Sequence, residues 1–133
     1  MKPLITLASA LLFLGVQAAI AGPVGVYDVA GVNPGDSTPY DGTVAVEIDG
    51  DTYTVPWDID GDEYIGTAIG AANLKGSMIF GEAVENDTAL TVSYGSGESF
   101  GLALFVEQEN GEWSGIWRFG GSNAIGSEIW TRQ

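Results

Sequence analysis

Glu128 is the residue whose type and position best suit it to a chemical task. Along the segment 125–131 it alternates onto the same face as Gly126 and Trp130, and that face is expected to point inward. A carboxylate buried there could take part in acid–base chemistry, but glycoside hydrolysis needs a second carboxylate, and none is evident on the inward faces. The alternative is a structural role, in which Glu128 is hydrogen-bonded to Arg118 or to the backbone.

A dense run of acidic residues, Asp-x-Asp-Gly-Asp-Glu, occupies positions 58–63. Oxygen ligands at this density could bind Ca²⁺, which makes Asp58, Asp60 and Asp62 candidate metal ligands. The spacing differs from that of an EF-hand, because glycine stands at the fourth loop position and Ile69 at the twelfth. We therefore favour a hairpin tip with Asp-Gly in the turn, and we expect no tight calcium site, no other metal and no cofactor.

Aromatic side chains are the third candidate for a site. Rings of this kind line ligand pockets, and they also fill cores, so both interpretations stay open. With Glu128, the candidate ligand-binding residues are Tyr53, Trp57, Tyr64, Trp113 and Trp117.

The composition excludes several classes of function. The 133 residues contain no cysteine and no histidine, which removes thiol nucleophiles, Ser-His-Asp triads and histidine acid–base chemistry. Acidic residues outnumber basic ones by 18 to 4, for a net charge of −14. Such a surface repels nucleic-acid phosphates and would attract a basic protein partner.

The first 21 residues are typical of a secretory signal peptide. Lys2 supplies a positive start, Leu4–Val16 is an apolar run, and Ala19–Ala21 gives the small-x-small pattern of a cleavage site. The apolar run is too short to span a membrane. We therefore expect a single mature domain over 22–133, in the periplasm or secreted, with no membrane span.

Short runs rich in β-branched and aromatic residues, separated by glycines, make up the mature chain. This pattern predicts nine strands, with the segment 70–76 as the one place for a helical turn. The expected strands are Val24–Val32, Thr43–Ile48, Thr52–Asp58, Glu63–Ile69, Ser77–Glu82, Ala89–Tyr94, Phe100–Glu107, Glu112–Phe119 and Ile125–Thr131. Sequential strands with tight turns favour an all-β antiparallel meander of eight or nine strands, closed or nearly closed into a small barrel, with a β-sandwich as the alternative.

Two Asp-Gly pairs, at 49–50 and 60–61, predict two-residue hairpin turns. The registers that they set place Tyr53, Trp57 and Tyr64 on one inward face of three neighbouring strands. A wrong register would scramble this sorting of apolar and polar residues, so the agreement supports both turns.

An Asn-Gly pair at 110–111 predicts a third hairpin of the same kind. Its register places Leu104 and Val106 on the inward face, together with Trp113 and Trp117. If the sheet closes, this face and the preceding one point into the same interior.

Small residues are expected beside the inward rings, and Gly66 and Gly115 are the clearest cases. A barrel of about eight strands can hold one small ligand when some inward positions are small. We therefore predict an apolar cavity, open at one end, with walls formed by Trp57, Tyr64 and Trp117. The alternative is that the rings lean over the glycines and fill the space.

Spaced glycines and aromatic residues form a pattern through nearly the whole mature chain. The pattern comprises Gly25-x-Tyr27-x-Val29-x-Gly31-x-Asn33-Pro34, Tyr40-x-Gly42-x-Val44, Tyr53-x-Val55-x-Trp57, Gly115-x-Trp117 and Gly126-x-Glu128. It resembles a group of small secreted proteins of Gram-negative bacteria, mostly uncharacterised. The resemblance implies export and an all-β fold, and no activity. The expected architecture is also similar to that of avidin and lipocalin barrels.

These observations favour an exported, non-enzymatic binding protein that holds a small apolar or aromatic ligand. The first alternative is an acidic inhibitor or adhesin that docks on a basic protein. The second alternative is a small barrel enzyme that uses carboxylate and tyrosine chemistry, which a buried carboxylate beside an open cavity would favour.

Overall fold

The computed structural model describes residues 22–133, so the expected signal peptide lies outside the described residues. Within them, all nine predicted strands are present, and most differ from the prediction only by small shifts at their ends, but the second strand begins at Pro39 instead of Thr43. The segment expected to form a helical turn instead continues the fourth strand as far as Leu74, so that prediction is wrong. The strands are β1 (Gly25–Val32), β2 (Pro39–Asp49), β3 (Thr52–Ile59), β4 (Asp62–Leu74), β5 (Ser77–Gly81), β6 (Ala89–Ser96), β7 (Ser99–Glu107), β8 (Trp113–Phe119) and β9 (Gly126–Arg132).

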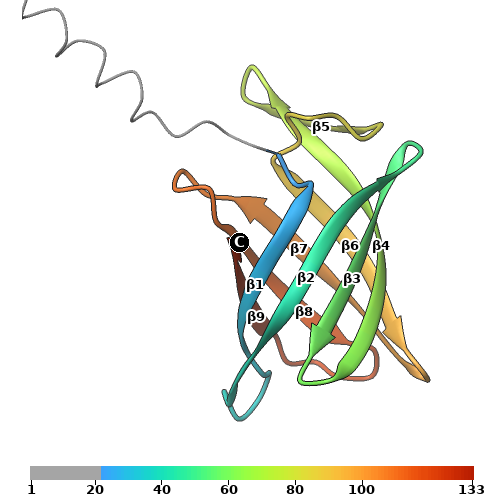
Figure 1. Ribbon diagram of the computed structural model, residues 1–133, viewed down its shortest axis with the longest axis vertical. Helices are drawn as coiled ribbons and strands as arrows, with labels where there is room; N and C mark the ends of the chain where they lie inside the picture. The colour runs from blue at the N-terminus through green and yellow to red at the C-terminus, as the bar shows by residue number, and fades with distance from the viewer. Residues whose placement is uncertain (1–21) are drawn as a thin grey trace, which may run out of the picture.

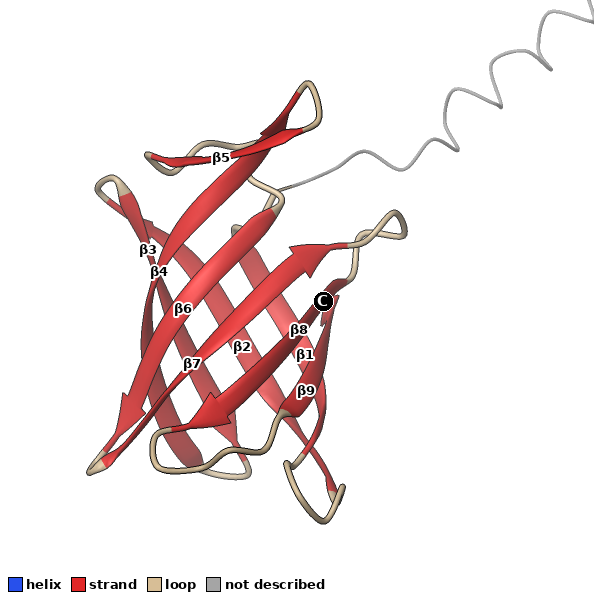
Figure 2. Cartoon of the chain, turned by 180° about the vertical axis from the view of Figure 1, so that it is seen from behind, coloured by secondary structure: helices blue, strands red, loops and turns tan. Residues whose placement is uncertain are grey.

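Eight of these strands form a closed antiparallel barrel (Figure 1). Each barrel strand pairs with its neighbour in the chain, except that β4 pairs with β6, and β9 pairs back with β1 to complete the ring. Strand β5 pairs only with the far part of β4, and this hairpin projects beyond the barrel (Figure 2). The closed ring confirms the predicted barrel and rules out the two-sheet sandwich.

In the first half of the barrel, the observed hairpin turns give the same inward face as the one predicted from the sequence. At 60–61 both residues have positive φ, as a type I′ turn requires, and Trp57 lies opposite Tyr64 as predicted. At the preceding hairpin the loop is Gly50-Asp51, and only Gly50 has a positive φ, of 63°. The observed pairing is therefore two residues away from the predicted one, and because side chains alternate with a period of two, the inward face is unchanged.

The hairpin around Asn110 differs from the prediction. The backbone amide of Gln108 donates to the carbonyl of Glu112 (2.7 Å), so the strands are joined by a longer connection that displaces the pairing by one residue. A one-residue displacement turns side chains to the other face of a strand. Leu104 and Val106 consequently point outward and are about half exposed, whereas Phe105 points inward. The predicted inward positions of Leu104 and Val106 are wrong.

One end of the barrel is covered by the segment 82–88, and we call it the closed end. The amide of Ala83 donates to the carbonyl of Asp51 (2.9 Å), which ties this segment to the β2–β3 turn. The side chain of Asp87 is buried beneath the segment and accepts a hydrogen bond of 2.5 Å from the hydroxyl of Tyr53. Burial, reinforced by this hydrogen bond, raises the pKa of Tyr53 above its usual value, so Tyr53 remains a neutral donor.

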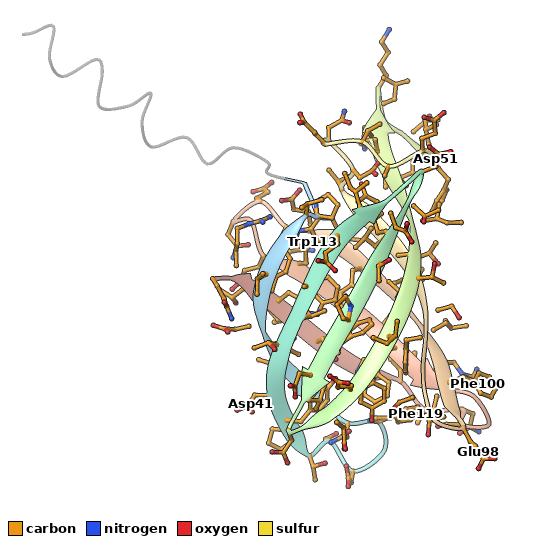
Figure 3. All side chains as sticks on the ribbon, turned by 45° about the vertical axis from the view of Figure 1, so that its right-hand side comes forward. Asp41, Asp51, Glu98, Phe100, Trp113 and Phe119 are labelled. Carbon is orange, nitrogen blue, oxygen red and sulfur yellow. The ribbon has the colours of Figure 1, made fainter. Side chains whose placement is uncertain are left out.

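Side chains from all eight barrel strands fill most of the interior. Trp113 lies in the half of the barrel toward the closed end, the end at which Asp51 also lies, whereas Phe119 lies toward the opposite end (Figure 3). Near the middle, the rings of Phe105 and Trp130 stack with their centroids 3.9 Å apart. Nothing in residues 22–133 forms a helix long and apolar enough to cross a membrane.

Candidate ligand-binding site

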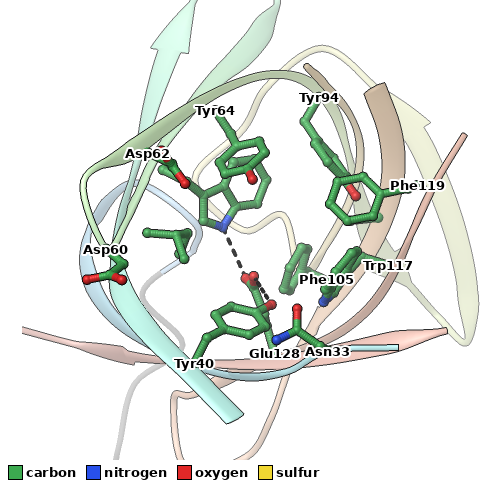
Figure 4. A pocket seen from close by; sticks show the side chains of 13 residues that line it. Asn33, Tyr40, Asp60, Asp62, Tyr64, Tyr94, Phe105, Trp117, Phe119 and Glu128 are labelled. Carbon is green, nitrogen blue, oxygen red and sulfur yellow. Dashed lines mark hydrogen bonds between the residues drawn. The ribbon is translucent and has the colours of Figure 1, made fainter. Parts of the chain in front are cut away.

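The end opposite the segment 82–88, which we call the open end, leads into a cavity of about 260 Å³ (Figure 4). This end carries the β3–β4 turn and the β1–β2 and β8–β9 connections. The volume lies just below the usual range of pockets for drug-sized molecules, so it suits a smaller ligand.

Aromatic rings form the wall of the cavity. Trp57 and Tyr64 come from neighbouring positions on β3 and β4, and the ring of Tyr94 on β6 lies edge-on to both. Trp117 and Phe119 on β8 continue the wall, with their ring centroids 5.0 Å apart. Each pair adopts the edge-to-face geometry that aromatic rings prefer. The wall is therefore held by ring-to-ring packing before any ligand enters.

Glu128 lies at the inner end of the cavity and is nearly buried, with 7% of its surface exposed. It projects from β9, where its neighbours across the two adjoining strands are Gly31 on β1 and Gly115 on β8. A Cβ atom at Gly31 would lie 2.1 Å from the ring of Tyr40, and one at Gly115 would lie 2.2 Å from the ring of Phe105. The two glycines thus leave the space in which these rings pack beside the carboxylate.

Three neutral donors hold the carboxylate of Glu128. The hydroxyl of Tyr40 donates to Oε2 (2.6 Å), and the indole nitrogens of Trp57 and Trp130 both donate to Oε1 (3.0 and 2.8 Å). Burial raises the pKa of Glu128, and the three hydrogen bonds act in the opposite direction because they stabilise the anion. The expected partner Arg118 makes no such contact, since its guanidinium reaches the backbone carbonyls of Phe119 and Ser122 instead.

Two tyrosines near this carboxylate stay protonated at neutral pH. Burial, together with the charge of Glu128, raises the pKa of both Tyr40 and Tyr94 far above the usual value for tyrosine. The hydroxyl of Tyr94 donates to the carbonyl of Arg118 (2.9 Å). Both hydroxyls therefore serve as fixed hydrogen-bond donors at the cavity wall.

The indole nitrogen of Trp117 is a buried donor without a hydrogen bond to any of residues 22–133. It lies on the side of the ring that faces Tyr40 and Asn33 (Figure 4). This indole N–H group lies close enough to the hydroxyl of Tyr40 to counteract part of the rise in the pKa of Tyr40, but the geometry between the two groups is not that of a hydrogen bond. A buried donor left unpaired is costly, so an acceptor that enters the cavity would gain from it.

The predicted site residues fall into two groups. Trp57, Tyr64, Trp117 and Glu128 all line the cavity. Tyr53 lies instead at the closed end beneath the segment 82–88. Trp113 is also fully buried in the closed half, away from the cavity. The two misplaced residues share the inward face of the barrel, and a shared face does not say at which end a residue lies.

Several lining residues were missed by the sequence analysis, above all Tyr40 and Tyr94. Tyr40 belongs to a part of β2 that was predicted as loop, and its contact with Glu128 joins residues 88 positions apart. The usable signal was Gly31, since an inward glycine on a strand marks the close approach of a large neighbour.

The acidic run at 58–63 does not form a metal site. No group of three or more potential ligands among residues 22–133 is close enough to hold a metal ion. Asp58 accepts a hydrogen bond from the amide of Gly61 (3.0 Å) and so stabilises the turn, while Asp60 and Asp62 are exposed at the rim of the cavity. Asp58, Asp60 and Asp62 are thus not gathered into a group that could hold a metal ion in the described part of the chain.

No protein-family model matches the chain, and no curated protein is significantly similar to it. The resemblance to small secreted bacterial proteins therefore stays a prediction.

Proposed function

We propose that this protein is an exported, non-enzymatic binding protein that holds one small molecule with an aromatic or apolar body in the open end of its barrel. The observation that carries the proposal is the cavity of about 260 Å³, in which a wall of aromatic rings surrounds a single buried carboxylate. Mostly apolar cavities with a few fixed polar groups are the usual form of small-molecule sites.

The construction of the two ends supports this proposal. At the closed end the interior is packed, and the hydroxyl of Tyr53 donates a hydrogen bond to the carboxylate of Asp87. At the open end the rings leave space beside Glu128. The indole nitrogens of Trp117 at the open end and of Trp113 in the closed half both lack a partner among the described residues, so the difference between the ends lies in the cavity. A barrel that served only as a rigid scaffold would have no need of this difference.

An enzymatic role is the second candidate, because Glu128 and Tyr40 are joined by a 2.6 Å hydrogen bond beside the cavity. A carboxylate whose pKa is raised by burial can act as a general acid or base. The two candidates differ in what happens to the ligand. A bound molecule that is recovered unchanged after prolonged incubation supports binding, and one that is converted supports catalysis.

The proposed function can be tested by tryptophan fluorescence with a panel of indoles, small aromatic amines, phenols, fatty acids and sugars. At least one member should quench or shift the emission of the wild type. Trp117→Phe replaces a cavity indole, whose nitrogen makes no hydrogen bond with residues 22–133, by a smaller ring that does not contribute to the tryptophan emission, and it should lose most of the response. Trp113→Phe is the matched control at the closed end and should keep the response.

A silent panel would contradict the proposal, as would a response that depends on Trp113 and is independent of Trp117. Native mass spectrometry of protein purified from its own host adds a direct search for a retained ligand. A small molecule that stays bound at one copy per chain would identify the ligand itself, whereas the fluorescence panel identifies only its chemical class.

A further inference from the structure

The hydrogen bonds of Glu128 leave one acceptor position free. Each carboxylate oxygen can accept two hydrogen bonds. Oε1 accepts from the indole nitrogens of Trp57 and Trp130, whereas Oε2 accepts only from the hydroxyl of Tyr40. Since Glu128 lines the cavity, the free position on Oε2 is available to a donor that enters from the open end.

The carboxylate also lacks a countercharge in the described part of the chain. Arg132 donates to the carbonyls of Val24 and Gly22 at the closed end, and Arg118 donates to backbone carbonyls. Lys75, the third basic residue of 22–133, is exposed in the β4–β5 turn beyond the barrel. A carboxylate held only by neutral donors in a buried site gains strongly from a cation.

The surroundings of Glu128 favour a cation in two further ways. The faces of aromatic rings attract cations, most strongly where water is excluded, and Trp57, Tyr64 and Tyr94 present such rings to the cavity. The rim carries Asp60 and Asp62, and the whole chain has a net charge of −14, so a cation is drawn to this end and an anion is repelled.

We propose that the ligand is a small organic monocation, a primary or secondary ammonium on an aromatic or apolar body. Its N–H donates to Oε2 of Glu128 and its body packs against the rings of Trp57, Tyr64 and Trp117. This inference deepens the proposed function and rests on it, since it names the class of molecule that the cavity takes.

Three probes that share one benzene ring test the charge directly by isothermal titration calorimetry at low ionic strength. They are 2-phenylethylamine, the neutral 2-phenylethanol and the anionic phenylacetate. The amine should bind at least tenfold more tightly than the alcohol, and phenylacetate should bind most weakly. Glu128→Gln keeps the size of the side chain and an acceptor oxygen for the two indoles, and it should reduce the preference for the amine about tenfold.

A second variant keeps the test decisive if Glu128→Gln does not fold. The double variant Asp60→Asn, Asp62→Asn removes two charges from the rim and should reduce the preference for the amine a few-fold. The control double variant Asp51→Asn, Glu109→Gln removes two charges from the closed end and should leave the preference unchanged.

The outcomes separate the inference from the proposed function. If 2-phenylethanol binds as tightly as the amine, the cation is wrong and a cavity for neutral aromatic ligands stands. If the preference for the amine survives in Glu128→Gln, the contact between the ammonium and Glu128 is wrong, and the inference is overturned as stated. If none of the three probes binds, the inference is overturned, and a silent fluorescence panel would then overturn the proposed function as well.

Discussion

At the scale of single residues, the packing around Glu128 depends on two neighbours that have no side chain. Gly31 and Gly115 lie directly across from it on the two adjoining strands, and the rings of Tyr40 and Phe105 occupy the space where their side chains would be. These glycines serve close packing, and their backbone φ angles are not in the left-handed region. The buried carboxylate and its donors therefore depend on residues that carry no polar group at all.

Glu128→Gln should stabilise the protein at neutral pH and not at acidic pH. Because burial raises the pKa of Glu128, the folded state favours the protonated form, and stability is lost as the pH rises from about 4.3 through the raised pKa. Glutamine removes this loss, which amounts to about 1.4 kcal/mol for each unit of the shift.

The check is chemical denaturation of both proteins between pH 4 and pH 9. The nearest other titrating groups, Tyr40 and Tyr94, stay neutral in this range because their pKa values are raised, and the rim residues Asp60 and Asp62 are common to both proteins. A difference in unfolding free energy that is independent of pH would show that Glu128 does not titrate as a buried group.

Gly115→Ala should destabilise the fold by about 1–3 kcal/mol, the usual cost of overpacking a core. The added methyl would lie 2.2 Å from the ring of Phe105 and 2.6 Å from the carbonyl oxygen of Leu104, and a backbone atom cannot move aside cheaply. Gly81→Ala is the control, since no atom lies within 4 Å of its Cβ position. Urea denaturation that gave equal effects for the two variants would contradict this account of the glycines.

At the scale of elements, three Asp-Gly or Asn-Gly pairs in the sequence form three different connections. The pair at 60–61 forms a type I′ turn, the pair at 49–50 contributes only its glycine to a type II′ turn, and the pair at 110–111 lies in a longer loop. The sequence pattern located these three hairpins, but the number of loop residues decided which side chains of β7 point inward. A displacement of the strand pairing by two residues left the predicted inward face unchanged, whereas a displacement by one residue reversed it.

Gly50→Ala should cost at least about 1 kcal/mol, because an L-residue is strained at the positive φ that this position requires. Asp51→Ala, at the next position of the same turn, serves as the control. Its side chain is exposed, and only its carbonyl is used by Ala83, so the change should stay within about 0.5 kcal/mol. Equal melting temperatures for the two variants would count against the type II′ turn.

The segment 82–88 should be fixed to the barrel through one coupled pair. Asp87→Ala removes the acceptor for the Tyr53 hydroxyl and for the amide of Val84, and we expect a loss of about 1–3 kcal/mol. Tyr53→Phe alone leaves the carboxylate with one donor fewer and should cost less. In a double-mutant cycle the two effects should fall short of additivity by more than about 0.5 kcal/mol. Full additivity would mean that the 2.5 Å contact does not stabilise the fold.

At the scale of the whole molecule, the sequence predicted the barrel well and the site only in part. Alternation within strands identified which face is inward, so Trp57, Tyr64, Trp117 and Glu128 were all placed correctly. Alternation carries no information on depth along the barrel axis, which is why Tyr53 was grouped with them although it packs at the closed end.

The partners of Glu128 show the same limit. Tyr40 lies 88 residues away in the chain, and only closure of the ring between β1 and β9 brings it to the carboxylate. Contacts of this kind follow from the pairing of the first and last strands, which no local pattern specifies. A barrel with one packed end and one hollow end is thus a property of the assembled ring, and the proposed binding function depends on it.

The most direct test of a ligand site at the open end is a nitrogen-15 NMR titration that follows the four indole N–H signals. Trp57 and Trp117 line the cavity, whereas Trp113 is buried in the closed half and reports on the rest of the barrel. On addition of 2-phenylethylamine, the signal of Trp117 should move most, that of Trp57 should move with it, and that of Trp113 should stay in place. A titration in which no indole signal moves, or in which Trp113 moves as far as Trp117, would contradict a ligand site at the open end.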